Sequence, residues 1–109
     1  MAKPIKNPVC EGQLFELGQV VVTAGVNEFL KEHPEARLYV STILVRHARG
    51  DWGDLCAQDL KSNDDALNYP GDELDGRLFS AYVSDRWPKM WIITEWDCSA
   101  TTVLFPDEY

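Results

Sequence analysis

Residues 77–105 read RLFSAYVSDRWPKMWIITEWDCSATTVLF, and this stretch governs the predicted architecture. The segments at 85–88 and 97–99 are short and rich in turn residues, as expected for hairpin turns. The β-branched and aromatic residues between them are typical of strands and fall in three runs, at 77–84, 89–96 and 100–105. The sequence therefore predicts a three-stranded antiparallel meander in this part of the chain.

A strand and a helix are predicted further upstream. Within residues 14–22, the run LGQVVV at 17–22 is apolar and β-branched, which indicates a strand. Thr23 can then cap a helix that begins at Ala24, and Pro34 prevents that helix from continuing.

Two more helices are predicted before the meander. Residues 37–47 are ambiguous, because their many β-branched residues suit a strand, yet Ser41 could cap a short helix that Gly50 ends. We favour the helix. Residues 54–68 predict the other helix, whose positions at spacings of four, three and four share one face: Cys56, Leu60, Asn63 and Leu67.

Helices followed by a meander predict an α+β fold, with two or three N-terminal helices packed on a mainly antiparallel sheet. We expect residues 14–109 to form one domain, preceded by a mobile arm at 1–13. Alternation along 77–84 puts two sets of side chains on opposite faces. We expect the more apolar set to face the core: Phe79, Ala81 and Val83, with Ser80 and Tyr82 pointing outward or into a groove under the helices.

Composition excludes several classes of protein. The chain has 109 residues and a formal net charge of -8, which argues against direct binding to nucleic acid or to an anionic membrane. The N-terminal lysines are followed by no apolar segment, so we expect neither a secretory signal nor a membrane span, and a cytoplasmic location. The three cysteines and two histidines are scattered, and no nucleotide or metal motif occurs, so we expect no cofactor and no metal.

The densest group of candidate functional residues is HARGDWGD at 47–54. Its glycines permit a tight turn that would expose Asp51, Trp52 and Asp54 together. His47 lies four residues before Asp51, near enough for the carboxylate to orient the imidazole as a general base. The same residues also suit a helix C-cap followed by an aspartate N-cap, with the tryptophan in the core. Both interpretations stay open.

Three residues outside this segment are further candidates. Asn63 lies on the apolar side of its predicted helix, where its amide either binds a ligand or bonds the preceding turn. Tyr82 is a candidate for binding. Glu95 lies inside an apolar strand, where a carboxylate must be exposed or paired, and it is a candidate for catalysis.

Most of the excess negative charge falls within residues 51–75, which hold eight acids and one base. Such a run is usually a solvated surface. Carboxylates spaced along a surface can also compete with nucleic-acid phosphates for the Arg and Lys of a partner protein. The residues we consider for this role are Asp64, Asp65, Asp72 and Glu73.

An ordered set of motifs resembles a family of small bacterial proteins described only as plasmid-related, found on plasmids and other mobile elements. The resemblance covers residues 18–109 and is carried by HARGDWGDL (47–55), NDDAL (63–67), RLFSAY (77–82), WIITE (91–95), SATTVL (99–104) and PDEY (106–109). The family brings no established activity. The resemblance implies a setting, a mobile element, in which small acidic proteins often counter host restriction or CRISPR defence.

Two functions from different classes follow. The favoured hypothesis is an acidic interaction protein of a mobile genetic element with a protein partner, for example an inhibitor or nucleic-acid mimic acting on a host DNA-processing or defence protein. The alternative is a small enzyme or ligand-binding domain centred on residues 47–54, with His47 as the base. The sequence does not indicate an oligomeric state.

Overall fold

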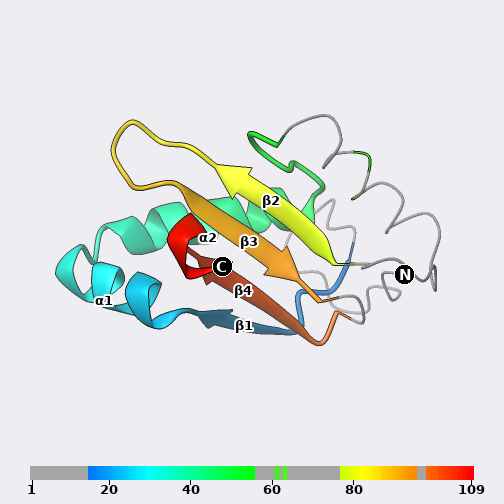
Figure 1. Ribbon diagram of the computed structural model, residues 1–109, viewed down its shortest axis with the longest axis horizontal. Helices are drawn as coiled ribbons and strands as arrows, with labels where there is room; N and C mark the ends of the chain where they lie inside the picture. The colour runs from blue at the N-terminus through cyan, green and yellow to red at the C-terminus, as the bar shows by residue number, and fades with distance from the viewer. Residues whose placement is uncertain (1–14, 56–60, 62, 64–76, 96–97) are drawn as a thin grey trace.

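The computed structural model describes residues 15–55, 61, 63, 77–95 and 98–109. These residues form a four-stranded sheet that carries two helices, α1 (Ala24–Glu32) and α2 (Ala36–Ala48) (Figure 1). The predicted α+β class is confirmed. The predicted arm at residues 1–13 lies outside the described part of the chain.

The sheet is mixed, with the strand order β1-β4-β3-β2. Strands β2 (Leu78–Tyr82), β3 (Met90–Thr94) and β4 (Ala100–Leu104) are consecutive antiparallel neighbours, so the predicted meander is present. Strand β1 (Gln19–Val22) pairs in parallel with β4, which hydrophobic pattern alone did not indicate. A short 3₁₀ helix, η1 (Pro106–Glu108), follows β4.

Helix α1 begins where the sequence predicts. The Thr23 hydroxyl accepts a hydrogen bond from the backbone N–H of Val26 (3.4 Å), as an N-cap should. The carboxylate of Glu108, from η1, accepts bonds at the same helix end from the Thr23 hydroxyl (2.6 Å) and the Gly25 N–H (3.0 Å). A negative charge there also suits the helix dipole. The helix start thus fastens the last turn of the chain to the sheet.

Helix α2 settles the ambiguous segment in favour of a helix, but a longer one than predicted. It starts at Ala36, so Ser41 is an interior residue and not a cap. Burial explains why the β-branched residues did not produce a strand: the buried positions of this helix recur with helical spacing and face the sheet. These positions are Ala36, Val40, Ile43 and His47, and Ala48 at the helix end is buried as well.

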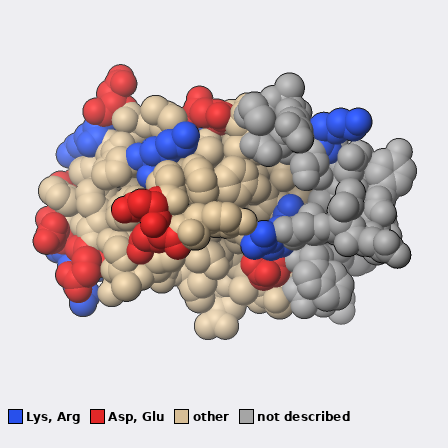
Figure 2. Space-filling model, in the orientation of Figure 1, with Lys and Arg blue, Asp and Glu red and all other residues tan. Residues whose placement is uncertain are grey.

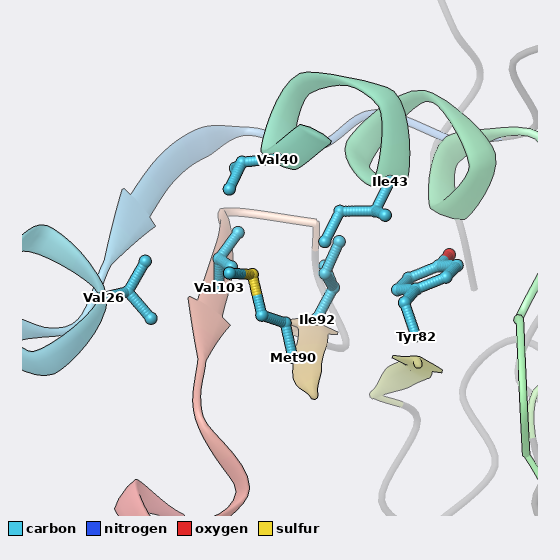
Figure 3. Close-up of a cluster of buried hydrophobic side chains, with 7 residues drawn as sticks. All are labelled: Val26, Val40, Ile43, Tyr82, Met90, Ile92 and Val103. Atoms are coloured by element: carbon cyan, nitrogen blue, oxygen red, sulfur yellow. The ribbon is translucent and has the colours of Figure 1, made fainter. Parts of the chain in front are cut away.

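The main core lies between the helices and the sheet. Figure 3 shows Val40 and Ile43 pointing from α2 toward the strands, where they meet Val103 and Ile92. Fully burying an aliphatic side chain of this size stabilises the fold by roughly 1.5–3 kcal/mol. The remaining members of the cluster are Val26, Tyr82 and Met90.

The predicted core face of β2 is wrong. Tyr82 pairs with Met90 and Ser80 with Ile92, and these pairs lie under the helices, whereas the side chain of Val83 is 60% exposed. The apolar character of a strand is a poor guide here because Ser80 is tolerated in the core through a hydrogen bond to a helix side chain, described below.

The predicted helix at 54–68 falls mainly outside the described residues. Lys61 and Asn63, the described positions within 56–68, both have helical backbone. In the part of the chain that the structure describes, neither α1 nor α2 combines the length and the apolar character needed to cross a bilayer.

Candidate functional site

Helix α2 ends in a turn that Gly50 closes. The Gly50 N–H donates to the carbonyl of His47 (3.1 Å), and the Asp51 N–H donates to the carbonyl of Arg46 (2.8 Å). Gly50 has a φ of 82°, in the left-handed region that glycine adopts without a Cβ penalty. The helix therefore stops here, and the chain turns toward strand β2.

The segment after the turn pairs with the free edge of β2. The Ala81 N–H donates to the Trp52 carbonyl (3.2 Å), and the Asp54 N–H donates to the Ala81 carbonyl (2.7 Å). Between them Gly53, at a φ of 73°, lies so close that a Cβ there would be 2.1 Å from the Ala81 oxygen. The Asp54 carboxylate then accepts a bond from the Val83 N–H (3.0 Å). Asp54 thus caps a strand edge.

Asn63 continues the same edge. Its side-chain amide donates to the Phe79 carbonyl (2.6 Å) and accepts from the Phe79 N–H (2.9 Å). The side chain is buried, at 1% exposure, with its donor and acceptor sides both bonded to one backbone unit. The amide thus has a structural role in bonding the backbone, but its partner is β2 and not the preceding turn expected from the sequence.

His47 lies at the centre of a buried chain of hydrogen bonds. Its Nδ1 is 2.5 Å from the Ser80 hydroxyl, and its Nε2 is 2.9 Å from the Thr94 hydroxyl. The Thr94 and Thr101 hydroxyls are 2.7 Å apart, and Thr101 donates to the carbonyl of Leu17 (2.7 Å). This series of hydrogen bonds links α2, strands β2, β3 and β4, and the segment before β1.

The carbonyl at one end fixes the direction of this chain. Because Thr101 gives its only proton to the carbonyl, its oxygen accepts from Thr94, and Thr94 in turn accepts from Nε2–H of His47. In the neutral ring, which burial favours, Nδ1 is then the unprotonated nitrogen and accepts from Ser80. The proton of the neutral imidazole therefore lies on Nε2.

The surroundings of His47 keep it neutral. The rings of Phe15 and Trp52 meet the imidazole edge-on, with centroids 5.2 Å and 5.4 Å away, and the side chain has 0% exposure. This burial lowers the pKa of His47 to about 3. Both ring nitrogens are occupied by the protein itself. The ring is therefore not placed to take a proton from a substrate.

The expected pairing of Asp51 with His47 is wrong. The Asp51 carboxylate accepts two hydrogen bonds from the guanidinium of Arg46, at 2.7 Å and 3.2 Å, and a third from the Gly53 N–H (3.2 Å). Arg46 holds the pKa of the Asp51 carboxyl below its usual range. The imidazole turns into the core, whereas this ion pair lies on the surface, because α2 ends at Ala48 and the turn at Gly50 takes Asp51 out of the helical spacing.

The other sequence-predicted residues are dispersed. Trp52 is buried at 6% exposure and packs against Phe15, so it offers no free stacking surface. Tyr82 is buried under α2 and donates its hydroxyl to the Asp51 carbonyl (2.7 Å). Glu95 is half-buried at the end of β3, where its backbone closes the turn to β4. Within the described part of the chain, no hydrogen bond, ion pair or ring contact joins Glu95 to His47.

The four proposed acidic contact residues, Asp64, Asp65, Asp72 and Glu73, lie outside the described residues. Among the residues that are described, no group of three or more His, Cys, Asp or Glu side chains is arranged to hold a metal ion.

Sequence reasoning underrated the buried hydroxyls. Ser80, Thr94 and Thr101 are all fully buried around His47, although serine and threonine are ordinary in strands. Each belongs to a strand of the meander, and the register of β3 with β4, which the structure shows, places Thr94 opposite Thr101. Without that register, their convergence on one histidine was not apparent.

Comparison of the chain with models of known protein families, with curated proteins and with solved structures finds no match in any of the three. The geometry of the site therefore carries the functional argument.

Proposed function

We propose that the protein is a non-enzymatic interaction protein that binds a protein partner through acidic side chains. The observation that carries the proposal is the state of His47, which is fully buried with both ring nitrogens hydrogen-bonded inside the protein. A general base must reach the proton that it removes. The residues that most resembled a catalytic site instead hold α2 and the edge of β2 in place.

Charge supports the same proposal. The chain carries a net charge of -8, and residues 51–75 contribute most of that excess. Of the acids in this run, Asp51 and Asp54 are described; both are exposed, and each accepts hydrogen bonds from the protein itself. Binding to a basic partner therefore falls to the other acids of the run, for which we propose Asp64, Asp65, Asp72 and Glu73.

The proposed partner is a host DNA-processing or defence protein with a basic groove, and the process is the competition between a mobile genetic element and its host. Carboxylates that imitate phosphates would occupy such a groove and inhibit its owner. The acidic run and the motif resemblance to plasmid-related proteins support this part of the proposal.

The test is affinity capture from a bacterial lysate with a tagged wild-type chain and a variant in which the four acids named above are changed to lysine. A matched control changes four exposed acids outside residues 51–75 to lysine: Glu28, Glu32, Glu35 and Asp85. The two variants have the same net charge, so only the position of the change differs.

We expect the wild type and the control to retain a common partner, the acidic-run variant to lose it, and capture to weaken as salt is raised. The identified partner should act on, or bind, nucleic acid. Equal loss in both variants, or retention in both, would show that the acidic run is not the binding surface.

A further inference from the structure

The two edges of the sheet differ in whether other residues hydrogen-bond their outward backbone groups. At the β2 edge, residues 52–54 and the Asn63 amide bond the outward backbone groups of Phe79, Ala81 and Val83. At the opposite edge, no strand of the described part of the chain lies outside β1, which forms a border of the sheet in Figure 1. Proteins commonly block free edges, because an open edge pairs readily with another strand.

The open edge presents hydrogen-bonding groups. Gln19 and Thr23 direct their N–H groups inward, to the carbonyls of Ser99 (3.0 Å) and Val103 (3.1 Å). Along a strand, successive residues turn their backbone groups to opposite sides. Val20 and Val22 therefore direct their N–H and C=O groups away from β4, toward whatever lies beside β1.

The side chains of the same edge are uncharged, and three of the four are valines. Val20 is 43% and Val21 36% exposed, and no charged residue occurs from 17 to 27. The border that β1 follows in Figure 1 shows uncharged residues in its middle part in Figure 2. A strongly basic or acidic partner strand finds no complementary charge here. Two copies of an acidic chain, in contrast, repel each other least where charge is absent.

We propose that two copies of the chain pair through β1, antiparallel, about a two-fold axis at Val21. In this register, Val20 lies opposite Val22 of the second copy, and their outward N–H and C=O groups exchange hydrogen bonds. Val21 lies opposite Val21 of the second copy. The three central positions are then valine against valine, a cross-strand pairing that packs well, and Gln19 lies opposite Thr23 at each end, so that the two sheets become one.

The contact is small, so the dimer is concentration-dependent. Strand β1 has 4 residues, and its edge buries less than the roughly 1,600 Å² of a standard stable interface. The pairing register involves residues 19–23, so a substitution at Val21 leaves the four acids of the proposed partner surface unchanged. The two proposals are thus tested with different variants.

The test is sedimentation equilibrium of the full chain over a concentration series, with Val21→Lys and Val21→Glu variants. Each single variant places like charges opposite each other, and we expect the dissociation constant to rise at least about tenfold. Mixing the two variants places Lys opposite Glu and should restore association. Val83→Lys is the matched control, since this valine is exposed but follows the blocked β2 edge.

A wild-type chain that stays monomeric at about 1 mM would overturn the proposal. So would a dimer that survives Val21→Lys, or one that Val83→Lys weakens as much. If each single variant is monomeric and folded by circular dichroism, yet the mixture also stays monomeric, the register centred on Val21 is wrong.

Discussion

The side chain of Asn63 bonds both backbone groups of Phe79, so one amide does for this strand position what a neighbouring strand would do. Together with the backbone of residues 52–54, which pairs with Ala81, it closes the β2 edge. Asn63, which the sequence offered as a ligand-binding candidate, therefore completes the hydrogen bonding of a sheet edge.

Replacing Asn63 with Ala should reduce the free energy of unfolding by about 2 kcal/mol, because the N–H and C=O of Phe79 would lose their partners. Urea denaturation measures the loss. Asn27→Ala, at an exposed position of α1, is the control and should change stability little. Equal effects of the two substitutions would contradict the role given to Asn63.

Replacing His47 with Gln should also destabilise the fold, by about 2 kcal/mol or more, since Gln cannot bond the Ser80 and Thr94 hydroxyls in the same geometry. Chemical denaturation again provides the measurement, and His33→Gln, at a partly exposed histidine, is the control. A His47→Gln protein of unchanged stability would revive the catalytic interpretation.

Stability should fall with acid in a way that depends on His47. Its pKa is about 3 when folded and about 6.5 when unfolded, so below pH 6.5 the unfolded chain takes up a proton that the folded one does not. The contribution of neutral His47 to the free energy of unfolding is thus fully present above pH 6.5. It declines toward pH 3, by up to about 1.4 kcal/mol per pH unit. The difference between wild type and His47→Gln, followed by denaturation at several pH values, should shrink over this range. A constant difference would show that the pKa of His47 is not lowered.

Replacing Gly53 with Ala should be more damaging than replacing Gly50. Both glycines have positive φ, which costs an alanine about 1 kcal/mol. A Cβ at Gly53 would in addition lie 2.1 Å from the Ala81 oxygen and would push residues 52–54 off β2. We expect a loss of about 3 kcal/mol for Gly53→Ala, measured by thermal unfolding. Similar losses at the two positions would mean that the close approach is not rigid.

The carboxylate of Glu108 should matter for the order of η1. Its hydrogen bonds from the Thr23 hydroxyl and from the N–H groups of Gly25 and Phe105 lower its pKa. Glu108→Gln should therefore speed amide exchange at the start of α1 and in η1, while β2 and β3 stay protected. Asp107→Asn is the neighbouring control. Faster exchange throughout the sheet would show that the contact is not local.

The periodic elements were predictable, whereas the register that joins them was not. Hydrophobic pattern and turn residues place the meander and the start of α1 correctly, because local chemistry determines both. The parallel pairing of β1 with β4 depends on residues far apart in sequence, and periodicity carries no trace of it. The core face of β2 was wrong for the same reason, since Ser80 becomes buried only once His47 is there to bond it.

Among the site residues, too, some roles follow from neighbouring residues in the sequence and others depend on the folded structure. The glycine-terminated end of α2 follows from local sequence. The bond that Asp54 accepts from the Val83 N–H does not, because local sequence predicts an aspartate N-cap for the next helix and Val83 lies 29 positions away. The pairing of Asp51 with Arg46 does not, because a cation at the surface competes better for a carboxylate than a neutral imidazole in the core does.

The parallel pairing of β1 with β4 also determines when β1 can fold, because β1 is synthesised long before its partner strand. Two hydrogen bonds near β1 connect distant parts of the chain: the bond from Thr101 to Leu17 spans 84 positions, and the bond from Thr23 to Glu108 spans 85. The chain must close very long loops to make them. On the ribosome, at about 5–20 residues per second, β1 waits roughly 4–16 s for β4 to be synthesised. During that interval a valine-rich strand has no partner of its own, and a chaperone or a neighbouring nascent chain can reach it first.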